Sequence, residues 1–473
     1  MSRYTRHKDN LLALIRNGKP LTRGEQVLLT ILMSVPAMMA QLSHIIMQCI
    51  DSAMVGSLGA NASASIGLVS TTIWLFSSLN SAANVGFCVQ VAHKIGAGSM
   101  EEARNILRQS LPTCIAFSLF LAMVGSGISF CLPHWLGGSQ EICHDSSLYF
   151  LVFSLCLPFS GLNSLCCTML RCSGNVHVPS ILNIAMCVLD VVFNWFLIFP
   201  SHSLFGITIP GAGLGVVGAV IGTAMSFVVI SLVVLYFTTV RSRELCLTSE
   251  KGSFLPRMAT LRESARISLP IAVQHVVLCG AQIVTTIIVA PLGTIALAAN
   301  TFGITVESLC YMPGYGIADA ATAIVGQSLG AGRRRLAKSL ACMAICLGIA
   351  VMTVMGGLMY AFAPDLMSVM TPVVEVQQLA TLVLRVEAFA EPMFAASIVC
   401  YGVFVGAGDT FMPCTMNLVS IWFVRVTLAV AMATTMGLYG VWLAMAIELT
   451  FRGIVFLMRF RSGKWMHKFQ KKQ

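Results

Sequence analysis

The stretch Pro36–Gly59, PAMMAQLSHIIMQCIDSAMVGSLG, decides how the rest of the chain is interpreted. It is long and apolar enough for a membrane-spanning helix, and it contains one carboxylate, Asp51, among Met, Ile, Ala and Val. A charged side chain at bilayer depth is costly, so such an acid indicates a functional site with a partner on a facing helix. The structural alternative places Asp51 at the helix end, in the headgroups, as a cap. This segment alone leaves both interpretations open.

The composition is typical of a polytopic membrane protein. Of the 473 residues, 57% are hydrophobic and only 10% are charged, which is more apolar surface than a soluble domain hides. In this class a net charge of +10 indicates Lys and Arg on the cytoplasmic side of the membrane, so no nucleic-acid partner is expected. The 17 cysteines lie mostly in apolar segments without CxxC spacing, which favours packing over metal binding or disulfides. No cofactor is expected.

Twelve segments meet the length of about 20 apolar residues that a membrane helix needs. They cover residues 29–53, 65–92, 110–132, 147–170, 178–199, 214–239, 267–290, 296–325, 339–363, 380–405, 413–435 and 439–459. The sequence therefore predicts an all-α polytopic membrane protein, multi-pass in the lipid bilayer of the cytoplasmic (inner) membrane.

Lys and Arg are distributed unevenly between the connections. The even-numbered connections and the C-terminal tail carry them. The six odd-numbered connections, at 54–64, 133–146, 200–213, 291–295, 364–379 and 436–438, contain none. The positive-inside rule therefore predicts both termini in the cytoplasm. The basic N-terminus lacks a small-residue cleavage site before the first long helix and is interpreted as a cytoplasmic lead-in.

An internal repeat divides the chain into halves of six helices each. Residues 234 positions apart match without a gap: Pro36 with Pro270, Gln48 with Gln282, Gly-Ala-Gly at 96–98 with the same turn at 330–332, Gly174 with Gly408, and Asn183 with Asn417. Parallel repeats of this kind are a transporter architecture with the path between the bundles. The expected domains are a lead-in (1–28), an N-terminal lobe (29–239), a cytoplasmic linker (240–266), a C-terminal lobe (267–460) and a basic tail (461–473).

Several stretches carry a family resemblance. They are DSAMVGSLG at 51–59, RCSGNVHVPSILN at 171–183, VGQSLGAGRRRLAKS at 325–339 and GAGDTFMPCTMN at 406–417. With the proline in the first helix, they resemble the multidrug and toxic compound extrusion (MATE) family of secondary transporters over roughly residues 25–460. The resemblance implies two pseudo-symmetric six-helix lobes in a V shape. It also implies export of organic cations or other amphipathic compounds, driven by inward flow of protons or sodium.

The repeat shows that Asp51 belongs to the N-terminal half alone, because its repeat mate is Thr285. The fifth predicted helix contains Asp190 and Asn194, whose spacing of four residues places them on one helical face. The repeat mates of this pair are both apolar, Val424 and Leu428. This polar face is therefore also confined to the N-terminal half.

These three side chains are expected to form one cluster that binds the coupling cation or proton. The first and fifth helices both run outward, and Asp51, Asp190 and Asn194 fall in their outer halves. Asn183, deeper on the fifth helix, is expected to join them. Burial disfavours charged carboxylates, and a second carboxylate nearby disfavours charging both, so the pair could hold a proton at neutral pH. Sodium would instead need several oxygen ligands around ionised Asp51 and Asp190, and both ions stay open.

The arrangement is similar to the DinF-like branch of the family rather than the NorM-like branch. The DinF-like pattern has an acid in the first helix and an Asn/Asp pair on the fifth. Asp190 stands here where that pattern has Asn, and Asn194 where it has Asp. The NorM-like branch has a glutamate in the seventh helix, where QHVVLCGAQIV at 274–284 offers Leu278 and no acid.

The C-terminal half has acids of its own, Glu307 on the eighth helix and Glu387 and Glu391 on the tenth. The structural alternative pairs Glu391 with Arg385 or Arg425. Glu448 and Arg452, four residues apart, are expected to pair with each other. The expected substrate path comprises Asn163, Gln48, Gln282, Glu307 and Glu391.

Pro36 and Pro270 free backbone carbonyl groups and allow their helices to bend. A bend of the first helix that depends on protonation of Asp51 would couple ion binding to transport. We therefore expect a monomeric antiporter that exports organic cations or multiple drugs in exchange for protons or sodium by alternating access.

Three alternatives belong to other functions. A lipid-linked oligosaccharide flippase of the same superfamily needs a strongly cationic cavity, whereas few Lys or Arg lie within the predicted spans. Export of an endogenous metabolite, or a sensor on the transporter scaffold, also stays open. An enzyme is not expected, because no HExxH or nucleophile–base arrangement is present and the nine histidines are scattered.

Overall fold

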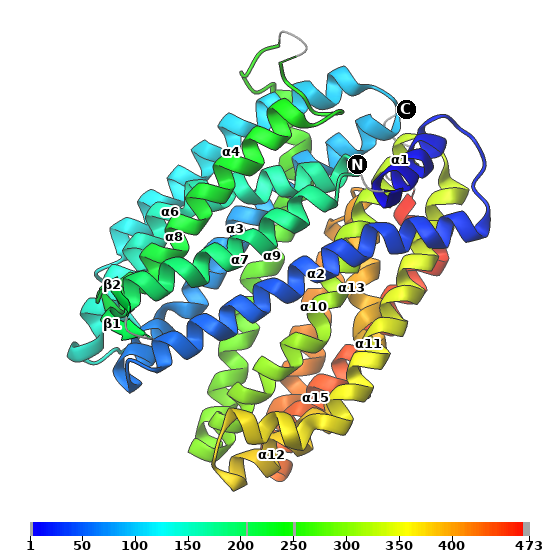
Figure 1. Cartoon of the computed structure of the whole chain (residues 1–473). Coiled ribbons are helices and arrows are strands. Elements are labelled where there is room, and N and C mark those ends of the chain that lie inside the picture. The colour runs from blue at the N-terminus through cyan, green and yellow to red at the C-terminus, as the bar shows by residue number, and fades with distance from the viewer. Residues whose placement is uncertain (1–2, 205–206, 249–251, 467–473) are drawn as a thin grey trace. The chain divides into compact units, whose positions relative to one another are not determined.

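The structure is a computed structural model that describes residues 3–204, 207–248 and 252–466, and it is almost entirely helical, as predicted (Figure 1). The long helices are α2 (Arg23–Gly56), α3 (Ala60–Gly96), α4 (Met100–Ile128), α6 (Gln140–Cys172), α7 (His177–Ile198), α8 (Gly215–Tyr236), α9 (Met258–Val289), α10 (Thr294–Gly330), α11 (Arg334–Met370), α13 (Glu391–Gly406) and α15 (Thr427–Ser462). The shorter helices are α1 (Arg3–Arg16), α5 (Leu132–Trp135), α12 (Val374–Glu387) and α14 (Phe411–Val419). Two π-helical turns, η1 (Phe237–Arg241) and η3 (Ser420–Val426), and a 3-10 turn, η2 (Ala290–Leu292), complete them.

The predicted spans correspond to these helices. Among the described residues, ten segments are long and apolar enough to cross a membrane, and α12 with α13 forms an eleventh that is bent by 59°. One of the ten, Phe411–Ser462, contains Gly437 in a non-helical conformation (φ 61°, ψ −141°) that separates two helices. This break lies where the sequence predicted the last connection, and it accounts for the twelfth helix.

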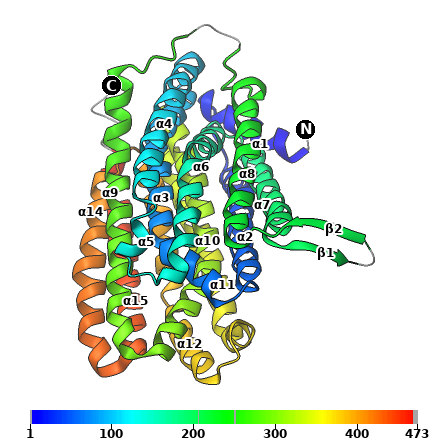
Figure 2. The same cartoon turned by 90° about the vertical axis from the view of Figure 1, so that its left-hand side faces the viewer.

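Two local features differ from the sequence expectation. The tenth span was expected to run unbroken over 380–405, but it breaks between Glu387 and Glu391, directly before Pro392. Proline lacks an amide hydrogen and clashes with the preceding turn, so a helix ends before it. The connection 200–213 forms an antiparallel hairpin of β1 (Pro200–Leu204) and β2 (Ile207–Ala212), which projects from the ends of α7 and α8 (Figure 2).

The duplication is visible in the backbone. Glycines 234 residues apart share left-handed conformations: Gly59 and Gly293 (φ 122° and 104°), Gly98 and Gly332 (78° and 72°), Gly174 and Gly408 (96° and 75°). Only glycine adopts such φ values readily, so each pair ends or begins a helix in the same way in both halves. The predicted Gly-Ala-Gly turns are therefore helix ends.

Contacts divide the chain into two compact units. Unit 1 comprises Met1–Leu42, Gly96–Gly98 and Val273–Gln473, and unit 2 comprises Ser43–Ile95 and Ser99–Ala272. The divisions thus fall inside α2 and α9, shortly after Pro36 and Pro270. They differ from the predicted lobes, because residues before 43 group with the C-terminal half and the predicted linker groups with the N-terminal half.

Hydrogen bonds explain both differences. In unit 1, α1 buries Leu11, Leu12 and Ile15. Arg333 Nη1 donates to the Leu14 carbonyl (3.3 Å), and Ser339 Oγ donates to Gln26 Oε1 (2.6 Å). These contacts fix the start of the chain to unit 1.

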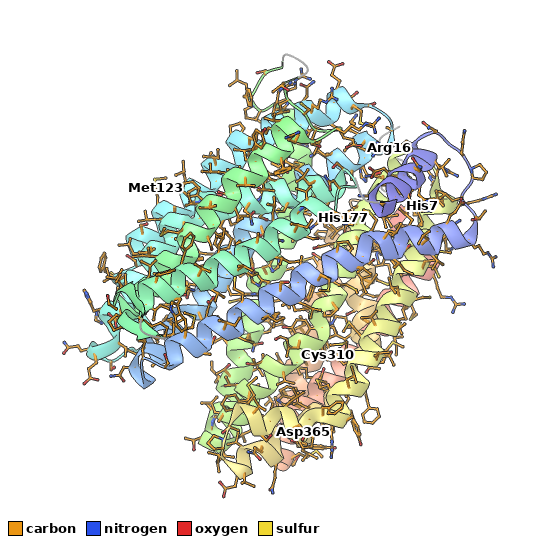
Figure 3. The ribbon with its side chains drawn as sticks, in the orientation of Figure 1. His7, Arg16, Met123, His177, Cys310 and Asp365 are labelled. Atoms are coloured by element: carbon orange, nitrogen blue, oxygen red, sulfur yellow. The ribbon has the colours of Figure 1, made fainter. Side chains whose placement is uncertain are left out.

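The linker is fixed within unit 2. Arg108 Nη2 donates to the Leu247 carbonyl (3.0 Å), and the Arg257 amide donates to Gln109 Oε1 (3.1 Å). Leu245 is fully buried between them in the core of this unit. On the outer face of the same unit, Met123 of α4 is 67% exposed (Figure 3), as expected for a lipid-facing helix.

Candidate functional site

Asn194 connects the two acids that the sequence predicted to lie together. Its Nδ2 donates to Asp51 Oδ1 (2.9 Å) on α2 and to Asp190 Oδ2 (3.1 Å), one turn earlier on α7. Asp190 and Asn194 are fully buried, and Asp51 is half-buried. Because both acceptor atoms surround one nitrogen, they are no more than about 6 Å apart.

No described Lys, Arg or His forms an ion pair with Asp51 or Asp190. Burying two negative charges side by side without a positive partner is strongly unfavourable. A proton on one carboxyl group, or a cation bound between the two, would relieve this repulsion. The structural alternative for Asp51, a solvated cap at the helix end, does not fit its hydrogen bond to a buried amide on another helix.

Helix α8 completes the site with residues that the sequence analysis did not single out. Ser226 Oγ donates to the Thr223 carbonyl (2.8 Å) and lies 3.5 Å from Asp190 Oδ1. At Gly222, a Cβ atom would overlap Asn194 Oδ1, so only glycine lets α7 approach this closely. The spacing of Thr223 and Ser226 within an otherwise apolar helix was the available signal.

The remaining polar atoms of the cluster are oxygens. Asn194 Oδ1 is buried without a hydrogen-bond donor, and it faces the same cluster as Asp51, Asp190 and Ser226. Such a set suits a proton or a hard cation, which prefers oxygen ligands. Among the described residues, no group of three or more His, Cys, Asp or Glu could hold a metal ion.

The other predicted members of the N-terminal site lie elsewhere. The oxygens of Asn163 and Asn183 both accept from Cys167 Sγ (3.6 and 3.8 Å). Asn183 precedes Asp190 by seven residues, which is about 10 Å along a helix, so it does not contact the carboxylates. The side chains of Gln48 on α2 and Gln282 on α9 are exposed.

Three acids of the C-terminal half are buried. Glu307 is 6% exposed, and Glu387 and Glu391 are fully buried. None of the carboxylate oxygens of Glu387 and Glu391 has a hydrogen-bond partner. Glu307 lies on α10 in unit 1, one turn before Cys310, which is labelled in Figure 3.

The structural alternative for Glu391, an ion pair with Arg385 or Arg425, is not formed. Arg385 donates to the Tyr360 carbonyl (3.4 Å) and lies over its ring, and Arg425 pairs with Glu448 (2.8 Å). The bend before Pro392 separates α12, which carries Arg385, from the start of α13, which carries Glu391.

Glu448 is the centre of an ion network. The predicted pair with Arg452 is confirmed at 3.1 Å, and Arg425 and Ser420 are added to it. Both added residues belong to the π-helical turn η3, whose wider turn brings side chains five residues apart to one face. Sequence spacing suited to an α-helix could not predict this arrangement.

Asp319 is a further acid that the sequence analysis missed. It lies on α10 and is half-buried, and Gln41 Nε2 of α2 lies 3.5 Å from its Oδ2 within unit 1. The signal was the same as for Asp51, a carboxylate within an apolar helix.

Comparisons with known proteins identify the scaffold. The family model MatE matches twice, over residues 36–196 and 270–431. The two matches begin 234 residues apart, at Pro36 and Pro270, which supports the internal repeat. The chain is 25% identical over 442 residues to the "Probable multidrug resistance protein NorM" of Thermotoga maritima, covering 92% of each chain.

Solved structures show the same fold. A structure described as "Outward-facing conformation of a multidrug resistance MATE family transporter of the MOP superfamily" is 20% identical with a TM-score of 0.86, covering 96% of this chain and 98% of that one. A MOP superfamily transporter from Pyrococcus furiosus is 19% identical with a TM-score of 0.86, covering 95% and 97%. At this identity the likeness concerns the fold alone. Because the family model covers well over half of the sequence, in both repeats, the chain belongs to the MatE (MATE) family of membrane transporters.

Proposed function

We propose that the chain is a secondary active antiporter that exports organic cations, including multiple drugs, in exchange for protons. Sodium is the alternative coupling ion. The relative named as a multidrug resistance protein supports the substrate class. The observation that carries the proposal is the Asn194 amide group that Asp51 and Asp190 share without any cationic partner.

In this geometry, the electrostatic energy of the cluster depends on whether a proton or a cation is bound to it. With both carboxyl groups charged, the Asn194 amide is the one described side chain that donates strongly to them. A proton or a cation removes most of the repulsion, because it neutralises one of the two charges. Binding of the coupling ion at this cluster and binding of substrate at the acids of unit 1 are proposed to exclude one another, because each belongs to a different conformation of the alternating-access cycle.

Helix α2 links this event to the rest of the molecule. Its part up to Leu42 belongs to unit 1, where a Cβ at Gly316 would overlap Met38, and its part from Ser43 belongs to unit 2. Asp51 thus holds the outer part of α2 to α7 while Pro36 weakens the helix nearby. Protonation of Asp51 changes this hold, and the helix bends at Pro36 in response. Pro270 is proposed as the equivalent bend in α9.

The acids of unit 1 are proposed to contact substrate. Glu307 and Glu391 are buried charges that no described base neutralises by an ion pair, and they would attract an organic cation. The exposed amides of Gln48 and Gln282, and Asn163, complete the proposed path. On the acid in α2 and the missing acid at Leu278, we assign the chain to the DinF-like branch. We also infer cytoplasmic termini and a monomer in the inner membrane.

The test is efflux of a fluorescent organic cation from proteoliposomes with the pH gradient and the sodium gradient imposed separately. Proton coupling predicts efflux with the pH gradient alone. Efflux with the sodium gradient alone would assign the site to sodium, and efflux with neither would contradict antiport.

Matched variants locate the coupling. Asp51→Asn and Asp190→Asn are expected to abolish gradient-driven efflux. Asp365→Asn removes an exposed carboxylate at the end of α11 (Figure 3) and is expected to leave it unchanged. Wild-type efflux by both site variants would contradict a coupling role for the cluster.

A further inference from the structure

Unit 2 contains a cavity of about 250 Å³. It lies at those ends of the helices that are joined by the connections containing Lys and Arg. It lies where α6 ends, α7 begins at His177 (labelled in Figure 3) and η1 ends. Its lining residues are Leu170, Asn175, Val178, Phe237, Arg241 and Ser242. No Asp or Glu lines it, so the one charge on its wall is the Arg241 guanidinium group.

Three donors on the cavity wall have no acceptor within it. Arg241 is exposed and makes no hydrogen bond or ion pair with any described residue. Asn175 uses its Oδ1 to accept from the Val178 amide (3.3 Å), which leaves its Nδ2 as a donor. Ser242 uses its Oγ to accept from the Leu245 amide (3.2 Å), which leaves its hydroxyl hydrogen. A guanidinium group beside an amide and a hydroxyl group suits a phosphate.

The internal repeat allows the cavity to be compared with the equivalent position in the C-terminal half. Leu170 and Asn175 correspond to Phe404 and Asp409 in the other half. The same turn joins both pairs, because the amide of Asn175 donates to the Leu170 carbonyl and that of Asp409 to the Phe404 carbonyl, each at 2.9 Å. Equivalent positions can therefore be compared side chain by side chain.

In the C-terminal half, the position is filled by an ion pair and aromatic rings. Asp409 pairs with Arg459, from the end of the last helix, and this guanidinium group lies 5.8 Å from the Phe404 ring centre. The buried Trp465 packs against the same ring at 6.2 Å. In the N-terminal half, an amide replaces the carboxylate and leucine replaces the aromatic ring. Arg241, at the end of the sixth helix of the N-terminal half, therefore has no carboxylate beside it in the cavity lining.

We propose that this cavity binds the phosphate of an anionic phospholipid headgroup. Apolar residues make up half of the lining, and the adjoining α7, α8 and η1 expose Ile181 (63%), Tyr236 (50%) and Val240 (40%), respectively. Acyl chains would cover these side chains while the headgroup meets Arg241, which a free phosphate would not do. Basic pockets between helices at a membrane surface bind anionic headgroups in this way. With the proposed orientation of the chain, the lipid comes from the inner leaflet.

The experiment is native mass spectrometry of the purified full chain in detergent, titrated with phosphatidylglycerol or with phosphatidylcholine of the same acyl chains. We expect tighter binding of phosphatidylglycerol and a loss of about fivefold in Arg241→Gln, equivalent to the ~1 kcal/mol that one basic residue contributes near a membrane surface. Arg243→Gln is the matched control, because Arg243 is equally exposed but does not line the cavity. Equal weakening by both variants, or equal binding of the two lipids, would overturn the proposal.

Two further variants introduce into the cavity the side-chain types that occupy the equivalent positions of the C-terminal half. Asn175→Asp supplies the missing carboxylate and Leu170→Phe the missing ring. Each is expected to remove the preference for phosphatidylglycerol while the melting temperature of the lipid-free protein is kept or raised, which excludes misfolding as the cause. Inorganic phosphate is the last arm. If it competes with phosphatidylglycerol at equal concentration, the cavity is a free-phosphate site and the lipid assignment is wrong.

Discussion

The two halves of the repeat bury their acids in opposite ways. In the N-terminal half, Asp51 and Asp190 share one amide group, at 2.9 and 3.1 Å. In the C-terminal half, Glu387 and Glu391 have no hydrogen-bond partner, while Glu448 collects two guanidinium groups. One half thus has a compact carboxylate pair without bases, and the other has unpartnered acids in the same unit as a base-rich network.

The positions involved do not correspond under the repeat. Glu307, Glu387 and Glu391 have the mates Ile73, Phe153 and Leu157, which pack in one hydrophobic cluster of unit 2. Asn194 has the mate Leu428, which packs in a hydrophobic cluster of unit 1. Each half therefore has polar side chains at positions where the other half has hydrophobic core residues. The shared scaffold tolerates this exchange at different helices, α2 and α7 in one half and α10, α12 and α13 in the other.

This difference suggests that the N-terminal half binds the coupling ion and the C-terminal half binds the substrate. A carboxylate pair held by one amide responds to a single proton or small cation, whereas acids without a shared hydrogen-bond donor attract a larger cation without fixing its position.

The largest effect is expected for Asp190→Asn. The asparagine keeps the shape but removes the charge, so the site no longer exchanges a proton, and gradient-driven efflux should fall to the rate of protein-free vesicles. Binding of an organic cation, measured by fluorescence polarisation, should persist because the C-terminal acids are intact. If binding disappears together with efflux, the two halves do not divide these tasks.

Glu448→Gln is expected to act on stability. It leaves Arg425 and Arg452, 18% and 9% exposed, without their anion, and breaking such a buried pair costs about 3–5 kcal/mol. The melting temperature in detergent should fall clearly. The matched control is Glu375→Gln, an exposed acid on α12, for which no change is expected. Equal melting temperatures of both variants would show that the network is dispensable for folding.

A smaller effect is expected for Gly222→Ala. The new Cβ overlaps Asn194 Oδ1, and overpacking of this kind costs about 1–3 kcal/mol. The substitution displaces the shared amide group. The efflux rate should therefore fall by more than the loss of stability alone would cause. Gly67→Ala is the control, since its Cβ on α3 meets no atom within 4 Å. Similar behaviour of the two variants would mean that the position of Asn194 is not critical for coupling.

Much of this arrangement could be predicted from the sequence because it depends on local patterns. Hydropathy predicted the spans, the constant offset predicted the repeat, and the four-residue spacing of Asp190 and Asn194 predicted their common face. The bend before Glu391 and the π-helical turn at Arg425 could not be predicted with the same rules, because both depart from regular α-helix spacing. The role of Gly222 depends on how closely α7 and α8 approach, which is a property of packing between helices.

Glu391→Gln should have the smallest effect on folding and the most informative one on transport. Its carboxylate has no hydrogen-bond partner to lose, so an amide of the same shape should leave the melting temperature close to that of the wild type. A role in substrate attraction predicts a raised KM for an organic cation with the dependence on the ion gradient unchanged. A structural role predicts neither change, and a coupling role predicts loss of gradient dependence. Because Asp190→Asn removes that dependence with binding intact, the opposite pattern at Glu391 would assign ion and substrate to different halves of one repeat.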